Sequence, residues 1–149
     1  MQHSLEPTAP NSNHRWFIEG LVCFLVALFP LAAFLSEGYL SFDNDTLYAD
    51  VARTMVMTGN WLDPQIHEVP FLDKPPLFFW ISGLFVEVLG DTTLAYRLPA
   101  AIFGAATASL IYFMLRRQGG SRLHGSLGAI ALLVCPLFFE YTRRAYMEV

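Results

Sequence analysis

Lysine is almost absent from this chain, in which Lys74 is the only example among 149 residues. Charged side chains of all kinds make up 15% of the sequence, which is less than a soluble domain of this length carries. The formal net charge is −4, so the chain lacks the basic face that phosphate backbones need. A nucleic-acid partner is therefore not expected.

Cysteine is similarly scarce. Cys23 and Cys135 are the only two, and both lie in apolar runs. We therefore expect buried free thiols in preference to a disulfide or a metal-binding pair. Internal repeats and Pro-rich low-complexity segments are also absent from the sequence.

Apolar residues are abundant instead. Hydrophobic side chains make up 54% of the chain, including 13 phenylalanines, and the mean hydropathy is +0.42. This composition predicts an all-α, multi-span helical membrane protein, with about three transmembrane helices and interfacial helices in the first outer loop. The first span is expected at about residues 16–35, which is long enough to cross a bilayer core. Because Arg15 is the only basic residue before it, we expect a retained anchor and not a cleaved signal peptide. Residues 1–14 are expected to be a disordered tail.

Three shorter apolar runs follow, at about residues 75–89, 98–115 and 126–139. The first of them is short and opens with Pro75-Pro76, so we expect it to lie in or dip into the outer leaflet without crossing. The other two are expected to span the membrane at about residues 97–115 and 124–141.

Orientation follows from the one short basic loop, formed by Arg116, Arg117 and Arg122, which is expected on the cytoplasmic side. The N-terminus is then cytoplasmic and residues 36–96 form an outer loop. Arg143, Arg144 and Glu148 fall on that same outer face. Arginines kept there either bind an anionic ligand or make ordinary head-group contacts, and the sequence leaves both readings open.

The first outer loop is strongly acidic. Between residues 36 and 74 it holds seven carboxylates against the two cations Arg53 and Lys74. A loop this long between apolar segments is usually functional. The seven carboxylates are Glu37, Asp43, Asp45, Asp50, Asp63, Glu68 and Asp73.

A short amphipathic helix is predicted inside this loop, with Asp45 as its N-cap and Gly59 just beyond its end. Its apolar face is expected to lie against the membrane. That face comprises Leu47, Tyr48, Val51, Ala52, Met55 and Val56. Asp45 can serve only as a cap, or it can share a catalytic site with Asp43.

Lys74 also has two readings. It can hold a phosphate, with Pro75-Pro76 fixing the backbone beside it, or it can be an interface lysine whose stem lies in the apolar layer. The candidates for a divalent metal site are Asp73, Asp43, Asp45 and His67. No ligand spacing here is diagnostic of a metal, and the sequence identifies no other cofactor.

Several short motifs together resemble the opening of class C membrane glycosyltransferases. They are Asp45-x-x-Tyr48-Ala49, Gly59-Asn60-Trp61-Leu62-x-Pro64, Phe71-x-Asp73-Lys74-Pro75-Pro76-Leu77-x-x-Trp80, Arg97-Leu98-Pro99-Ala100, Pro136-Leu137-Phe138-Phe139 and Arg143-Arg144-Ala145-x-x-Glu148. Within that class the chain is most similar to dolichyl- or undecaprenyl-phosphate-sugar transferases, namely protein O-mannosyltransferases and the lipid A aminoarabinose transferase. The similarity covers roughly residues 30–149.

The resemblance implies an active site on the outer, periplasmic face of a bacterial inner membrane. There a sugar would move from a polyprenyl-phosphate carrier to a lipid, glycan or protein acceptor, as in protein glycosylation or lipopolysaccharide modification. The family has Asp-Glu four and three residues before the tyrosine, where this chain has Asn44 and Asp45. The first aspartate of that pair is taken as the family's catalytic base. Because Asn44 stands there, the resemblance leaves Asp45 or the extra carboxylate of Asp43 as the base, and it places Glu148 at the family's second catalytic aspartate.

Such a transfer needs groups that hold the carrier phosphate as negative charge develops on it, and the candidates are Lys74, Arg143, Arg144 and Tyr48. Family members are several times longer, so residues 15–149 are expected to be only the N-terminal portion of the membrane domain, in a truncated chain that is inactive alone. Two other classes stay open: a small membrane assembly protein without catalysis, and a fragment of a transporter. The small residues Gly104, Ala105, Ala106 and Ala108 would suit the first, because they let a partner helix approach closely.

Overall fold

The computed structural model describes residues 12–37, 40, 43–66 and 69–145, without the side chains of residues 12–14, 43 and 44. Within this part the chain is mostly helical, with one two-residue hairpin in which Gln65 pairs with Pro70. The elements are α1 (Ser12–Ala32), α2 (Asp43–Thr58), β1 (Gln65–Ile66), β2 (Val69–Pro70), α3 (Leu77–Leu89), α4 (Thr93–Arg117), α5 (Arg122–Val134) and α6 (Pro136–Tyr141). The predicted tail of residues 1–14 lies outside the described residues, except that α1 already begins at Ser12.

Two helices in the described residues are long and apolar enough to cross a membrane, within Arg15–Ala32 and Thr93–Arg117. These are α1 and α4, and they match the predicted spans at residues 16–35 and 97–115. α4 begins where the Thr92 side chain accepts a hydrogen bond from the Ala95 amide, and it ends with two arginines that favour the negative end of a helix.

The third predicted span is not one helix. α5 ends at Val134, and Cys135 adopts an extended backbone (φ −64°, ψ 117°) before α6 begins at Pro136. A residue before proline is disfavoured in the helical conformation, which explains the break. The 13 residues of α5 extend only about 20 Å, too short for a bilayer core of about 30 Å. Cys135 itself is exposed, so its predicted burial is wrong, and both cysteines are free thiols.

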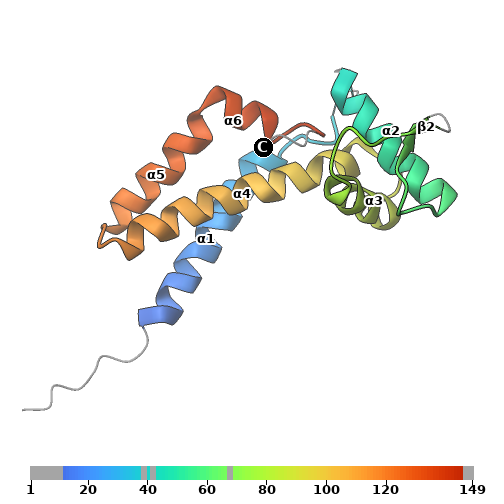
Figure 1. The fold of residues 1–149 in the computed structure, drawn as a ribbon. Helices are drawn as coiled ribbons and strands as arrows, with labels where there is room; N and C mark the ends of the chain where they lie inside the picture. The colour runs from blue at the N-terminus through green and yellow to red at the C-terminus, as the bar shows by residue number, and fades with distance from the viewer. Residues whose placement is uncertain (1–11, 38–39, 41–42, 67–68, 146–149) are drawn as a thin grey trace, which may run out of the picture.

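α4 is the central helix of the molecule, with α1 and α5 along one part of it and α2 and α3 gathered around its first turns (Figure 1). Small side chains let α1 approach α4 closely. Ala101, Ala105 and Ala108 of α4 pack with Ala27 and Leu31 of α1 in one buried cluster. Three of the small residues that could have served a partner helix, Gly104, Ala105 and Ala108, are therefore buried within the chain.

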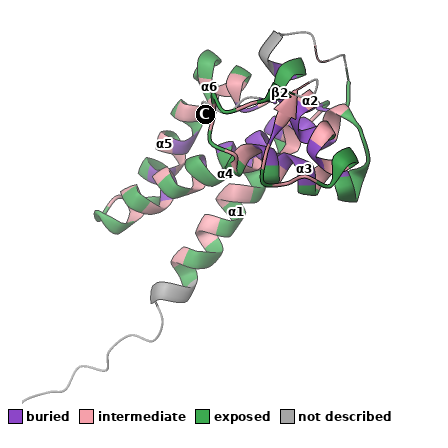
Figure 2. Ribbon diagram, turned by 45° about the vertical axis from the view of Figure 1, so that its right-hand side comes forward, coloured by how far each residue is buried: buried purple, intermediate pink, exposed green. Residues whose placement is uncertain are grey.

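The apolar face of α2 is covered by protein and not left for a membrane. Tyr48, Val51 and Met55 form a buried cluster with Phe79 of α3, as the purple segments of both helices show (Figure 2). Leu47, predicted to belong to the same face, is exposed at 37%. Gly59 follows the helix with φ +69°, the left-handed conformation expected of a residue just past a helix end.

The last turn of α1 is held by a side chain from the other end of the chain. Arg143 donates hydrogen bonds to the carbonyl oxygens of Pro30 at 3.0 Å and Ala33 at 2.7 Å, while its guanidinium lies 5.1 Å from the Phe139 ring centre. Carbonyls in the last turn of a helix lack partners within the helix, so these bonds replace water there.

Replacing Arg143 with methionine should therefore lower the free energy of unfolding by about 2 kcal/mol or more, because hydrogen bonds to charged groups are worth about 1.5–3 kcal/mol. The measurement is a denaturation curve of the protein in detergent. Arg122→Gln is the control, since the Arg122 side chain is 63% exposed and Glu19 keeps its second ion pair, with Arg116, so the loss should be less than about 1 kcal/mol. Equal losses in both variants would contradict this assignment.

Candidate functional site

Asp45 is the most unusual polar residue in the described structure. It is the third residue of α2 and its side chain is 0% exposed. Neither carboxylate oxygen has a partner at ordinary hydrogen-bond geometry, and the ion pair with Arg97 is long, with 3.9 Å between Nη2 and Oδ2. The prediction that Asp45 is the N-cap is wrong, because α2 already begins at Asp43. Leaving a buried carboxylate without hydrogen bonds costs free energy, so its position requires an explanation.

Arg97 reaches Asp45 from the second turn of α4. Its guanidinium, with the side chain 13% exposed, also donates to the carbonyl oxygens of Leu35 at 3.5 Å and Glu37 at 3.3 Å. Arg97 thus connects the segment after α1 with both α4 and α2. The sequence predicts no role for Arg97 beyond its place in the Arg97-Leu98-Pro99-Ala100 motif. The available signal was an arginine placed at the start of an otherwise apolar span, where a charge is costly without a partner.

Arg144 brings a second positive charge to the same region, just after α6. It forms an ion pair with Glu140, four residues earlier, and its guanidinium lies 5.7 Å from the Tyr141 ring centre. Burial raises the pKa of Asp45, whereas the charges of Arg97 and Arg144 and the backbone amide of Ala145 lower it, with a net upward shift. A carboxyl group with a raised pKa is a stronger proton acceptor once ionised.

The remaining predicted site residues are placed in different surroundings. Tyr48 is buried with its ring edge-on to Phe78 and Phe79, at 6.3 and 5.8 Å between ring centres. Lys74 is half-buried in the turn before α3, next to an exposed Asp73. Arg143 directs its guanidinium to the end of α1, as described above.

Asp43 begins α2, but its side chain is outside the description, and Glu148 lies beyond the last described residue. His67, named as a metal candidate, is also outside. Across the described ranges, no three His, Cys, Asp or Glu side chains gather closely enough to hold a metal ion.

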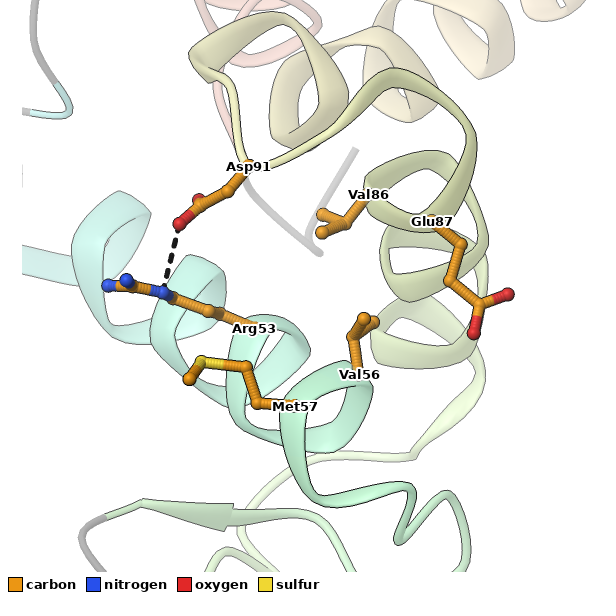
Figure 3. A pocket seen from close by; sticks show the side chains of 6 residues that line it. All are labelled: Arg53, Val56, Met57, Val86, Glu87 and Asp91. Carbon is orange, nitrogen blue, oxygen red and sulfur yellow. Dashed lines mark ion pairs between the residues drawn. The ribbon is translucent and has the colours of Figure 1, made fainter.

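A separate cleft of about 730 Å³ opens between α2 and α3 (Figure 3). The ion pair between Arg53 Nε and Asp91 Oδ2, at 2.9 Å, lies on one side of it, and Asp91 also accepts a hydrogen bond from the Tyr96 hydroxyl at 2.6 Å. Val56 and Val86 face one another across the apolar part. None of the predicted site residues lines this cleft. Its polar contacts tie α2 to the turn between α3 and α4.

Comparison with known proteins gives a consistent result. The sequence profile of the family described as dolichyl-phosphate-mannose-protein mannosyltransferase matches residues 73–149. An uncharacterized protein of Aquifex aeolicus is 32% identical over 130 residues, covering 85% of this chain and 26% of that protein. No solved structure matches the chain.

Curated relatives with assigned names are also similar. The undecaprenyl phosphate-alpha-4-amino-4-deoxy-L-arabinose arabinosyl transferase 2 of Proteus mirabilis is 30% identical over 116 residues, covering 78% of this chain and 20% of that enzyme. The enzyme of the same name from Sodalis glossinidius is 29% identical over 129 residues, or 87% of this chain and 23% of that enzyme. The chain thus spans about a quarter or less of the length of these relatives, in their N-terminal part. It belongs to the dolichyl-phosphate-mannose-protein mannosyltransferase family.

Proposed function

We propose that this chain contributes the first outer loop and the adjoining helices of a membrane glycosyltransferase that uses a polyprenyl-phosphate-linked sugar. α1 and α4 would span the bacterial inner membrane, with the N-terminus cytoplasmic and α2 and α3 on the periplasmic face. The similarity to arabinosyl transferases acting on an undecaprenyl phosphate sugar supports the donor class. The sugar and its acceptor are left open by this similarity.

The single observation that carries the proposal is the carboxylate of Asp45, which is buried without a close hydrogen-bond partner near Arg97 and Arg144. In the transfer, the bond between sugar C1 and the carrier phosphate oxygen breaks, and the electron pair stays on that oxygen. The acceptor oxygen bonds to C1 and its proton must leave. Asp45 would accept this proton or orient the acceptor, while Arg97, Arg144 and Lys74 would hold the phosphate as its charge develops. Because Asp45 is fully buried here, its carboxylate must become accessible when the substrates bind.

The proposal is tested by measuring release of polyprenyl phosphate from polyprenyl-phosphate-linked sugars in membranes that contain the protein as its host makes it. Arg144→Gln should reduce the rate by about 10²-fold or more, as expected on removing a group that stabilises a developing anion. Arg53→Gln is the matched control, since it removes one arginine from a half-exposed surface ion pair and should leave the rate unchanged.

Equal rates in wild type and Arg144→Gln, at saturating and at low donor concentration, would contradict the proposed role of Arg144 in the reaction. No release by the wild-type protein from any sugar in a panel of pentosyl and hexosyl donors would contradict the proposed activity itself.

A further inference from the structure

An apolar groove of about 470 Å³ runs between α1 and α4, away from Asp45 and its arginines. Its lining includes Trp16, Gly20 and Phe24 of α1 and Ala106, Ser109 and Phe113 of α4. The one hydroxyl of the set, on Ser109, donates to the Gly20 carbonyl at 2.7 Å and is therefore satisfied within the protein. From Trp16 to Phe24 the groove follows α1 for about 12 Å. Its size, shape and lining suit a single hydrocarbon chain.

One end of this groove is positively charged. The first turns of α1 lie beside the last turn of α4, and the described residues there include four arginines and Glu19. Glu19 is shared by Arg116, at 3.1 Å, and Arg122, at 2.7 Å. The other two, Arg15 and Arg117, are exposed and make no ion pair with any residue that the structure describes.

The charged end and the apolar groove are physically continuous. Phe113 lines the groove, and the guanidinium of Arg117 lies over its ring, 5.7 Å from the ring centre. Arg15 directly precedes Trp16, the first lining residue on α1. A tryptophan beside a cation is the arrangement found where membrane helices meet the head-group layer.

We propose that this groove binds one acyl chain of an anionic glycerophospholipid, whose phosphate is held by Arg15 and Arg117. Charge complementarity identifies this occupant, because two arginines without ion pairs border a channel whose lining is mainly apolar. A zwitterionic phospholipid would bring a choline or ethanolamine cation toward the same arginines and would bind less tightly. The site lies at the opposite end of α1 from Asp45 and does not depend on the transfer activity.

The test is native mass spectrometry of the purified chain, equilibrated with equal amounts of phosphatidylglycerol and phosphatidylcholine. Wild-type protein should retain one phosphatidylglycerol preferentially. Arg15→Gln and Arg117→Gln should each reduce that preference about fivefold, the effect expected for one cation near an anionic lipid. Arg53→Gln changes the net charge equally but lies outside the groove, so it should retain the wild-type preference.

A second variant separates the head group from the chain. Ala106 is exposed and lines the groove, so Ala106→Phe should fill it without disturbing the core, and both lipids should then be lost. Loss of both lipids in Ala106→Phe, with no effect of either arginine variant, would mean acyl-chain occupancy only and would overturn the head-group assignment. Unchanged retention in Ala106→Phe would place the lipid elsewhere and overturn the proposal entirely.

Discussion

Replacing Asp45 with asparagine should lower the rate of sugar transfer by about 10²–10⁴-fold, the contribution expected from a positioned proton acceptor. The variant keeps the size of the side chain and should still fold. Its rate is measured as release of polyprenyl phosphate by membranes, with the amount of inserted protein matched to wild type. Transfer at the wild-type rate would contradict a role for Asp45 in the reaction.

The same substitution should have the opposite effect on stability. Burial raises the pKa of Asp45 in the folded protein. The folded state therefore binds this proton more tightly than the unfolded state does. The contribution of this group to stability is therefore largest at low pH and falls as the pH rises through the raised pKa. Asp45→Asn removes this penalty, and its melting temperature relative to wild type should rise between about pH 4 and neutral pH.

Glu87→Gln provides the control for both measurements, because Glu87 is an exposed carboxylate in α3. It should change neither the rate nor the pH dependence of melting. A stability difference between Asp45→Asn and wild type that stays constant with pH would mean that Asp45 does not titrate in this range.

The second large effect is expected at Gly104 in α4. A Cβ there would lie 2.5 Å from Thr142 Cγ2 and 3.3 Å from Leu31 Cδ1. Both neighbours are fully buried, and the Thr142 hydroxyl donates to the Phe138 carbonyl, which restricts its movement. Gly104→Ala should therefore destabilise the protein by about 1–3 kcal/mol, as other overpacked cores do.

Gly20→Ala is the matched control in α1. Its Cβ would meet only Ser109 Oγ, at an ordinary 3.6 Å, so the usual helix preference should apply and stabilise the protein by up to about 1 kcal/mol. Opposite signs for two identical substitutions in long apolar helices are thus expected from chemical or thermal denaturation in detergent. A gain in stability from Gly104→Ala would show that Thr142 and Leu31 are not packed against α4 in this way.

The sequence predicts best those features that depend on long runs of one kind of residue. The apolar stretches that became α1 and α4 are unambiguous, and Gly59 marks the end of α2 as expected. The break at Cys135 could also have been predicted, since Pro136 follows it inside an apolar run. A hydropathy average does not detect such a break, which is why residues 124–141 were predicted to form one span.

Features that depend on which surfaces meet were not predictable in this way. The apolar face of α2 fits a membrane or a protein neighbour equally well, and only the structure shows Phe79 of α3 against it. The ion pair of Asp45 with Arg97 joins residues 52 positions apart, and no local sequence pattern predicts it. Arg143 and Arg144 are neighbours in sequence, yet one holds the end of α1 and the other contributes charge near Asp45.

The course of α4 through two separate buried clusters has a consequence for how the molecule opens. Its middle, around Ala105, packs against α1, whereas Ala95 and Tyr96 in its first turn pack with α2 and α3. Amide hydrogens in α2 and α3 should therefore exchange with solvent deuterium together, as one cooperative unit, while the middle of α4 stays protected. α2 and α3 would then open and close together about a helix that does not itself unfold.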